Sequence, residues 1–236
     1  MTAGTASPLV GRRAVVTGAS RGIGAALVRE LVAAGVAVAG VSRPGSTAVG
    51  GHRMVHGDLA TPEGVATVLQ GLRAWAPDGP DLLVNAAGVF PNATAERQDP
   101  AEFAQTMAIN VNAAFALTHW ALPLMKARGS GDIVSVGSVA DSHAWPGNSA
   151  YAASKFGLRA LHEVVRAETR GTGVRAILVS PSATDTDAWN AHEAQLGIGF
   201  PARSEMLAAG DVARAIVYAV SQPPHVTIEA LRITRS

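Results

Sequence analysis

The stretch Arg13-Ala-Val-Val-Thr17-Gly18-Ala-Ser-Arg-Gly22-Ile-Gly24 joins a short apolar run to a loop with three glycines. Its β-branched residues predict a strand over residues 13–17, and the apolar residues 25–34 predict a helix that ends at Gly35. Glycines in such a loop let the backbone approach a ligand, and the helix N-terminus attracts negative charge. This order is typical of a dinucleotide phosphate site, although the spacing differs from G-x-G-x-x-G and an ordinary glycine-rich turn is the alternative.

Strands and helices alternate along the rest of the chain. We expect further strands at residues 36–42, 53–57, 81–84, 132–137, 173–180 and 226–233. We expect further helices at residues 61–75, 100–128, 151–170 and 210–221, the second of them bent at Pro123. Residues 187–206 show weak periodicity and are interpreted as a mobile lid. The alternation predicts an α/β fold, a Rossmann-type doubly wound parallel β-sheet of about seven strands flanked by helices.

Length and composition restrict the class of protein. The 236 residues suit one domain, which we place at residues 11–236 after a flexible leader at residues 1–10 that does not resemble a signal peptide. A net charge of +1 argues against a charged nucleic-acid surface, and the absence of cysteine excludes disulfides and thiolate metal sites. Residues 103–125 carry no charged side chain, but their polar content favours a buried helix over a membrane span. We therefore expect a cytoplasmic protein that binds neither nucleic acid nor membrane.

A second stretch carries candidate chemistry at the end of the predicted strand 132–137. Ser138 follows the strand, and Tyr151 and Lys155 lie one turn apart on the predicted helix, with Asn148 or Ser149 as its N-cap. A nearby ammonium lowers the pKa of a phenol, and a serine hydroxyl can hold a substrate oxygen while the phenol transfers a proton. Tyr-x-x-x-Lys alone is a common chance match, in which case the lysine is an ordinary surface residue.

The choice of lysine strengthens the chemical interpretation. The chain has 17 Arg but only two Lys, Lys126 and Lys155. Arg stays protonated, whereas Lys can exchange its proton, so a lysine at position 155 favours a chemical role. The bias towards Arg, with abundant Ala and Gly, also indicates a GC-rich bacterial genome.

These segments together resemble the short-chain dehydrogenase/reductase family in its single-domain branch, over nearly the whole chain after the leader. Four signatures occur in family order: residues 17–24, the sequence Asn85-Ala86-Ala87-Gly88, the stretch around Asn110, and Ser138 with Tyr151 and Lys155. The resemblance implies hydride transfer between a nicotinamide cofactor and a carbonyl or alcohol.

The resemblance also implies roles for the catalytic residues. Tyr151 would be the general acid in reduction and the base in oxidation, Lys155 would lower its pKa and hold the nicotinamide ribose, and Ser138 would bind the substrate oxygen. Asn110 would hold a water that links Lys155 to solvent. Asn112 is a rival for that role, and its alternative is a buried polar residue satisfied by neighbouring backbone.

The cofactor contacts follow from the same resemblance. We expect them from Gly18, Ser20, Arg21, Gly22, Ile23, Gly24, Ser42, Arg43, Asp58, Leu59, Asn85, Ala86, Gly88, Tyr151, Lys155, Pro181, Thr184 and Thr186. NAD sites of this fold usually carry an acid at the end of the second strand, but this chain has Ser42 and Arg43 there. Arg43 and Arg21 can pair with a 2′-phosphate, so we expect NADP(H), unless both are ordinary surface arginines. Ser182 stands where the family usually has glycine, which restricts the backbone at the pocket floor.

The substrate is the least constrained part of the prediction. We expect contacts from Ser138, Tyr151, His143, Trp145 and Trp189, with Phe200 of the lid, to an apolar or aromatic ketone; a solvent-facing His143 is the alternative. No metal site is expected. The leading hypothesis is an NADP(H)-dependent ketone or aldehyde reductase, and the alternatives are an NAD-linked alcohol dehydrogenase and a catalytically silent cofactor-binding regulator. Apolar surplus on the helices at 100–128 and 151–170 predicts a homo-oligomer, a tetramer or dimer.

Overall fold

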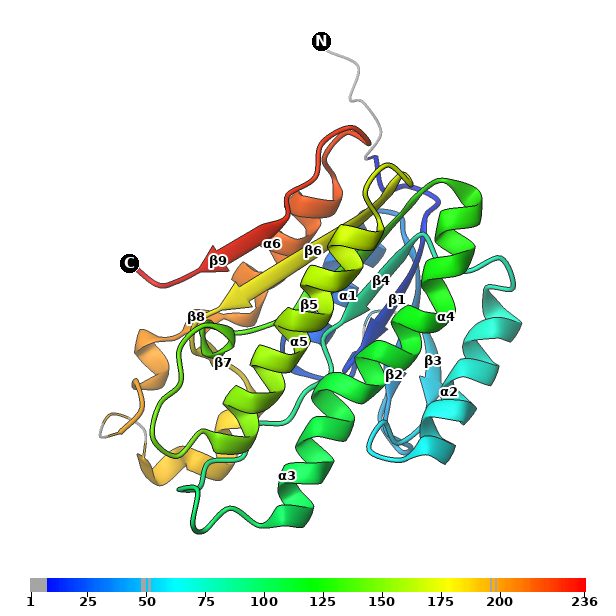
Figure 1. Cartoon of the computed structure of the whole chain (residues 1–236). Coiled ribbons are helices and arrows are strands. Elements are labelled where there is room, and N and C mark those ends of the chain that lie inside the picture. Colours follow the sequence, from blue (N-terminus) through cyan, green and yellow to red (C-terminus); the bar gives the residue numbers. More distant parts are fainter. Residues whose placement is uncertain (1–7, 48–49, 51, 196, 198) are drawn as a thin grey trace.

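A seven-stranded parallel sheet forms the centre of the molecule (Figure 1). The computed structural model describes residues 8–47, 50, 52–195, 197 and 199–236. The strands, in the spatial order β3-β2-β1-β4-β5-β6-β9, span Arg13–Thr17 (β1), Ala37–Ser42 (β2), Arg53–His56 (β3), Leu82–Asn85 (β4), Gly131–Val136 (β5), Val174–Pro181 (β6) and Ala230–Ile233 (β9). The order reverses between β1 and β4, which is the doubly wound arrangement, so the predicted Rossmann-type fold is confirmed.

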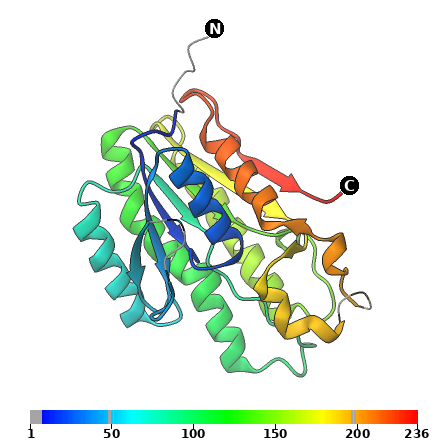
Figure 2. The ribbon, with the colours of Figure 1, turned by 180° about the vertical axis from the view of Figure 1, so that it is seen from behind.

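Helices cover both faces of the sheet. They span Gly22–Ala33 (α1), Pro62–Trp75 (α2), Pro100–Met107 (α3), Ala113–Arg128 (α4), Ser149–Glu168 (α5) and Ala209–Val220 (α6). α2, α4 and α5 lie on the face turned to the reader in Figure 1, and α1 and α6 lie on the opposite face, seen in Figure 2. Because the central strands are covered on both faces, their sequences are continuous apolar runs rather than alternating ones.

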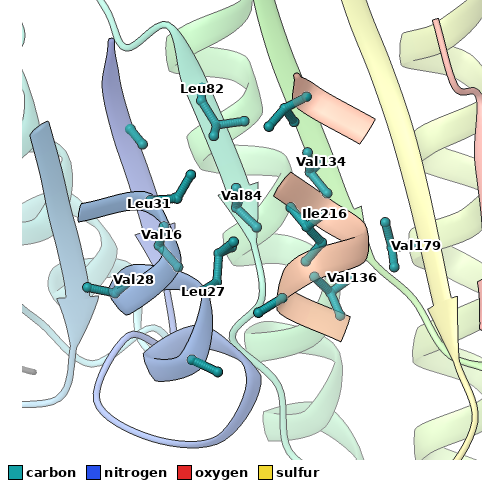
Figure 3. Close-up of a cluster of buried hydrophobic side chains, with 14 of the residues drawn as sticks. Val16, Leu27, Val28, Leu31, Leu82, Val84, Val134, Val136, Val179 and Ile216 are labelled. Atoms are coloured by element: carbon teal, nitrogen blue, oxygen red, sulfur yellow. The ribbon is translucent and has the colours of Figure 1, made fainter. Parts of the chain in front are cut away.

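Each face of the sheet buries its own apolar core. Figure 3 shows the core under α1 and α6, where Leu27, Leu31 and Ile216 of the helices meet Val84 and Val134 of the sheet. A second core lies under α2 and α4. Burying a leucine or isoleucine side chain contributes roughly 1.5–3 kcal/mol, so the two cores fix the positions at which the strands end.

A buried charge network ties together the start of β5 and β6. Asp132 accepts hydrogen bonds from the Arg175 guanidinium at 2.5 and 2.9 Å and from Arg12 at 2.6 Å. Arg175 also donates to the backbone carbonyls of Val220 and Val226. The buried carboxylate is therefore paired, and the network lies at the amino ends of the strands, away from the edge where their carboxyl ends meet.

The predicted helix at residues 100–128 is interrupted in the structure. Ala108–Asn112 form a π-helical turn (η1) between α3 and α4, whereas α4 continues through Pro123. The change in helical pattern therefore lies at η1, and a bend at Pro123, which lies inside α4, stays a prediction. Single π-turns inside helices occur frequently at functional sites.

Other boundaries differ by a few residues. α1 begins at Gly22, inside the glycine loop, and β9 covers only the last four residues of the predicted 226–233 strand. Residues 1–7 of the predicted leader lie outside the described residues, but Leu9 is 1% exposed within the core, so the domain begins before residue 11. Among the described residues no helix has the length and apolarity needed to span a membrane.

The predicted lid at residues 187–206 has secondary structure of its own. It contains two 3₁₀ segments, Asp187–Gln195 (η3) and Arg203–Glu205 (η4). Two short strands flank it, Thr184–Asp185 (β7) and Leu207–Ala208 (β8), and they pair with each other. Leu196 and Ile198 lie outside the described residues, and the mobility of the segment stays a prediction.

Candidate active site

A cavity of about 1070 Å³ lies at the carboxyl ends of the strands. The glycine loop, the ends of β2, β4, β5 and β6, and the lid surround it. Most of the predicted site residues line it: Gly18, Ser20, Arg21, Gly22, Ile23, Gly24, Ser42, Arg43, Asp58, Leu59, Ala86, Gly88, Ser138, Trp145, Tyr151, Lys155, Pro181, Thr184, Thr186 and Trp189. The structure thus brings together residues from most of the chain, as a doubly wound sheet does where its strand order reverses.

Three predicted site residues do not line this cavity. Asn85 directs its amide at Thr118 of α4, to which it donates a hydrogen bond of 3.3 Å. His143 is exposed and packs its ring on Trp145, so its predicted place in the substrate pocket is wrong and the solvent-facing alternative holds. Asn110 lies behind the cavity wall, as described below.

The glycine loop is shaped for a close approach to a phosphate. Gly18 and Gly22 have φ of +70° and +55°, which side chains rarely adopt. A Cβ on Gly24 would lie 2.2 Å from the carbonyl oxygen of Gly18, so the loop closes on α1 only without a side chain there. The start of α1 has no side-chain cap and no acidic residue in its first turn. Its N–H groups are therefore suited to an anion, which fits a dinucleotide pyrophosphate.

The loop is also tied to the end of β4. The Thr17 hydroxyl accepts hydrogen bonds from the backbone N–H groups of Ala86 and Ala87, both at 2.9 Å. A Cβ on Gly18 would lie 3.0 Å from the Cα of Ala87. The two predicted cofactor signatures, residues 17–24 and 85–88, therefore form one surface.

One end of the cavity carries two exposed arginines, Arg21 at the start of α1 and Arg43 directly after β2. Ser42, directly before Arg43, is buried, with its hydroxyl 3.5 Å from both the Arg43 carbonyl and Nδ1 of His56. No acidic residue ends β2, so the arrangement suits an additional phosphate better than a free ribose hydroxyl.

The other end of the cavity holds Ser138, Tyr151 and Lys155. Ser138 follows β5, and the other two lie on α5, where Lys155 Nζ is 5.5 Å from the centroid of the Tyr151 ring. Asn148 occupies the N-cap of α5 but makes no side-chain capping bond. Lys155 is 5% exposed and donates a hydrogen bond of 2.9 Å to the Val136 carbonyl. The predicted grouping of these three side chains is therefore observed.

The two titratable members are shifted by their surroundings. Burial lowers the pKa of Lys155 to about 8, while the nearby Asp141 carboxylate acts in the opposite direction. Burial raises the pKa of the Tyr151 phenol; a hydrogen bond with Ser138 lowers it and the Asp141 carboxylate raises it further. The net direction for Tyr151 is upward because burial outweighs the hydrogen bond, and the lowering of its pKa by Lys155 stays a prediction. The lysine ammonium instead donates to Val136.

Asn110 fixes the backbone next to this group rather than projecting into the cavity. Its Oδ1 accepts from Val89 N at 2.9 Å, and its Nδ2 donates to Val89 O at 3.0 Å and to Ser154 Oγ at 2.9 Å. These bonds occupy most of the amide, and they come from the π-helical turn η1. Its predicted water-holding role stays a prediction. Asn112 is exposed, so the alternative that it is a buried polar residue is wrong.

The floor of the cavity follows β6. Ser182, at the position where glycine was expected, donates its backbone N–H to Ile233 at 2.8 Å, and its carbonyl accepts from the Thr184 hydroxyl at 3.0 Å. Thr186 lies against the glycine loop, because a Cβ on Gly22 would be 3.2 Å from its methyl carbon. Ser182 is therefore accommodated, and Thr186 closes the loop side of the site.

An aromatic cluster covers the Tyr151 end of the cavity. The Phe90 ring packs edge-on against Tyr151 at 4.7 Å and against the lid residues Trp189, His192 and Phe200 at 5.1, 5.0 and 5.9 Å. His192 also bonds the Phe90 carbonyl through Nε2 at 3.0 Å. Sequence reasoning missed Phe90 and His192; the position of Phe90 two residues after Gly88 was the available signal.

A third missed residue is Asp141, three positions after Ser138. It is 2% exposed, yet it lies in the short 3₁₀ turn Val139–Asp141 (η2) directly behind Ser138. A charged side chain in this apolar stretch was the available signal, because buried carboxylates need partners. No cluster of His, Asp and Glu able to hold a metal occurs in the part of the chain that the structure describes.

Comparison with known proteins agrees with this geometry. The family model described as short chain dehydrogenase matches residues 12–197. The chain is 34% identical over 243 aligned positions to the glycine betaine reductase ATRR of Emericella nidulans, covering 96% of this chain but only 19% of that protein. It is 37% identical to the 2,3-dihydro-2,3-dihydroxybenzoate dehydrogenase of Escherichia coli K12 over 75% of this chain and 71% of the relative.

A solved structure gives the same answer. It is described as a candidate NAD(P)-dependent gluconate 5-dehydrogenase from Beutenbergia cavernae with NADP bound at low occupancy. It superposes with a TM-score of 0.83 at 28% identity and covers 98% of both chains. The sheet order, the glycine loop at the start of α1 and these matches lead to one conclusion: the chain belongs to the short-chain dehydrogenase family, whose members are oxidoreductases of carbonyl and alcohol groups.

Proposed function

We propose that the protein is an NADP(H)-dependent reductase of ketones or aldehydes. The observation that carries the proposal is the layout of a single cavity, with Arg21 and Arg43 at one end and Ser138, Tyr151 and Lys155 at the other. The glycine loop lies between these two groups. A dinucleotide laid along the loop would place its phosphates on α1 and its reactive ring near Tyr151.

The chain's own side chains carry out the proton transfer of the reaction. When bound, the nicotinamide cofactor supplies or accepts the hydride at the carbonyl carbon. Ser138 holds the substrate oxygen and Tyr151 donates its phenolic proton to that oxygen in reduction, or removes it in oxidation. Lys155 holds the ribose and keeps a positive charge beside the phenol. The pKa of Tyr151 is raised by burial in the cofactor-free protein, so the phenol carries the proton that the reductive step requires.

A turnover assay on Tyr151→Phe tests the chemical role. The substitution removes only the hydroxyl, so we expect turnover of small ketones to be lost while NADPH affinity changes little. Residual activity within about tenfold of the parent would contradict the role of Tyr151. Cofactor binding without turnover across a broad panel of ketones and alcohols would favour the regulator instead.

The choice of NADP(H) rests on Arg21 and Arg43. A charge-assisted hydrogen bond contributes about 1.5–3 kcal/mol, so Arg43→Ala should lower NADPH affinity roughly ten- to hundredfold and affect NADH little. Ser42→Asp combined with Arg43→Ala should shift preference towards NADH. The measurement is kcat/KM for both cofactors on one substrate. A parent enzyme that prefers NADH would support the NAD-linked alcohol dehydrogenase.

The wall of the substrate end supports a neutral, apolar or aromatic substrate. Phe90, Trp145, Trp189 and Phe200 line this part of the cavity. Of the described cationic side chains that line the cavity, Arg21 and Arg43 lie at the other end, and Arg235 donates to backbone carbonyls of the lid. Lys155 lies at the substrate end, but it is buried and its ammonium donates to the Val136 carbonyl. A substrate carboxylate would therefore lack a free partner, so aryl ketones should give higher kcat/KM than keto acids of similar size.

We also propose a homo-oligomer, a dimer or tetramer. Large apolar side chains are exposed on three consecutive helices: Phe103 on α3, Phe115 on α4, and Phe156 and Val164 on α5. A second copy of the chain could cover these exposed apolar side chains. Light scattering that shows only monomer at micromolar concentration would contradict this proposal.

A further inference from the structure

The residue behind Ser138 is a buried carboxylate that the reaction scheme above does not use. Asp141 does not line the cavity, and its side chain is 2% exposed. It lies at the end of η2, which begins one residue after Ser138. A buried charge at this position is costly unless it is paired, so its partners indicate what it does.

The partners of Asp141 hold the end of β5 against β6. Its Oδ2 accepts hydrogen bonds from the Ser180 hydroxyl, on β6, and from the backbone N–H of Ser138 at 3.4 Å. A Cβ on Gly137 would lie 2.6 Å from the same oxygen, so the glycine leaves room for the carboxylate. The Ser138 hydroxyl in turn accepts from Ala140 N at 3.1 Å. The position of Ser138 is thus fixed from both its backbone and its side chain.

The charge of Asp141 is only partly neutralised. Its Oδ1 forms an ion pair with Arg159 Nη1 at 3.5 Å, and that arginine side chain is 44% exposed. An exposed, long ion pair compensates weakly because water screens it. A net negative field therefore remains on the side of the buried turn that faces Tyr151 and Lys155, and it favours the protonated form of both.

We propose that Asp141 is a positioning residue: its buried carboxylate holds the backbone of Ser138, and its negative charge, one hydrogen bond behind Ser138, acts on the Tyr151 and Lys155 pair. The proposal rests on the proposed roles of Ser138, Tyr151 and Lys155. Lys155 lies beside Tyr151, and Arg159 pairs with Asp141. His192 packs on Phe90, which in turn packs on Tyr151. The other charged side chains that line the same cavity are Asp187, Glu205 and Arg235 and, from the glycine-loop side, Arg21, Arg43 and Asp58.

The chain offers a direct readout that needs neither cofactor nor turnover. It has only two tyrosines, Tyr151 and Tyr218. Tyr218 is exposed on α6, so Tyr218→Phe leaves Tyr151 as the sole source of phenolate absorbance. Ultraviolet titration of the cofactor-free protein in this background follows the Tyr151 proton alone, and it succeeds or fails independently of the proposed reaction.

Three variants in the Tyr218→Phe background separate charge from packing. Asp141→Asn keeps the size of the side chain but removes the negative charge, so the phenolate should form at lower pH. Arg159→Gln removes the compensating positive charge, so it should form at higher pH. Ser180→Ala removes a hydrogen bond but no charge, and should lower thermal stability with the titration midpoint unchanged.

The pH dependence of turnover should follow the same order. In Asp141→Asn, the alkaline limb of kcat/KM for reduction and the acid limb for oxidation should both move to lower pH. A titration midpoint in Asp141→Asn equal to or above the parent would overturn the proposal. If that variant does not fold, a midpoint in Arg159→Gln equal to or below the parent would overturn it as well.

Discussion

Replacing Lys155 by methionine should make the protein inactive but relieve a stability cost that depends on pH. The pKa of Lys155 falls from 10.5 in the unfolded chain to about 8 in the fold because its ammonium is buried. The difference is about 2.5 pH units, and one unit corresponds to ~1.36 kcal/mol, so the buried ammonium destabilises the fold by about 3 kcal/mol at pH 7. Because the folded pKa is the lower one, this cost is fully present below pH 8 and disappears as the pH rises towards 10.5.

Methionine also has a cost, which does not depend on pH. It leaves the Val136 carbonyl without the hydrogen bond that Lys155 donates, a loss of about 1–3 kcal/mol. The informative quantity is therefore the change with pH in the difference between the two proteins. At pH 9.5 the cost of burying the ammonium has fallen to about 1.4 kcal/mol. The free energy of unfolding of Lys155→Met should therefore fall by about 2 kcal/mol relative to that of the parent between pH 7 and pH 9.5.

Urea unfolding of both proteins without cofactor, at these two pH values, measures the difference. Lys126→Met is the matched control, because it removes the chain's other lysine outside the cavity. It should change stability equally at both pH values. If the difference in free energy of unfolding between Lys155→Met and the parent stays constant with pH, burial does not lower the pKa of Lys155 and the reasoning fails.

Two further predictions concern backbone packing and the buried charge network. Gly24→Ala places a Cβ against the Gly18 carbonyl and should lower NADPH affinity at least about tenfold, which a cofactor titration measures. In Gly157→Ala, on α5, the new Cβ lies 3.6 Å from its nearest neighbour, so this variant should stabilise the protein by up to ~1 kcal/mol, which a thermal melt measures. Arg175→Met leaves Asp132 buried without its main partner and should cost about 3–5 kcal/mol in urea unfolding, against ~1 kcal/mol or less for Arg166→Met; equal losses would contradict this account.

The fold was predictable because its elements differ sharply in local pattern. Short β-branched runs alternate with longer amphipathic segments, and the strands β1, β4, β5 and β6 lie within a residue or so of their predicted positions. The π-turn η1 was not predictable, because Ala108–Asn112 continues the helical pattern on both sides. Its cause is tertiary: Asn110 is held by the backbone of Val89 and by Ser154, residues far away in sequence.

The residues of the candidate site also fall into two groups, those that a local motif predicts and those whose role depends on contacts across the fold. Ser138, Tyr151, Lys155 and the glycine loop are encoded by local motifs, and the structure brings them into one cavity. Phe90, His192 and Asp141 were missed because their importance arises only from contacts across the fold. Conversely, His143 lies in the right loop by sequence but points to solvent, since no local pattern determines the direction of a loop side chain.

The aromatic cluster around Phe90 sets a condition on how the enzyme exchanges ligands. The cavity already reaches Tyr151 beside these rings, so a small ketone can bind without moving them. A substrate too large for that space must separate Phe90 from at least one ring of the lid, and the free energy lost in those ring contacts is subtracted from its binding free energy. A small ketone gains few ring contacts and should show a high KM. A flat, extended substrate exchanges one ring contact for another, and its product should leave slowly, which would make release rather than hydride transfer the slow step of the cycle.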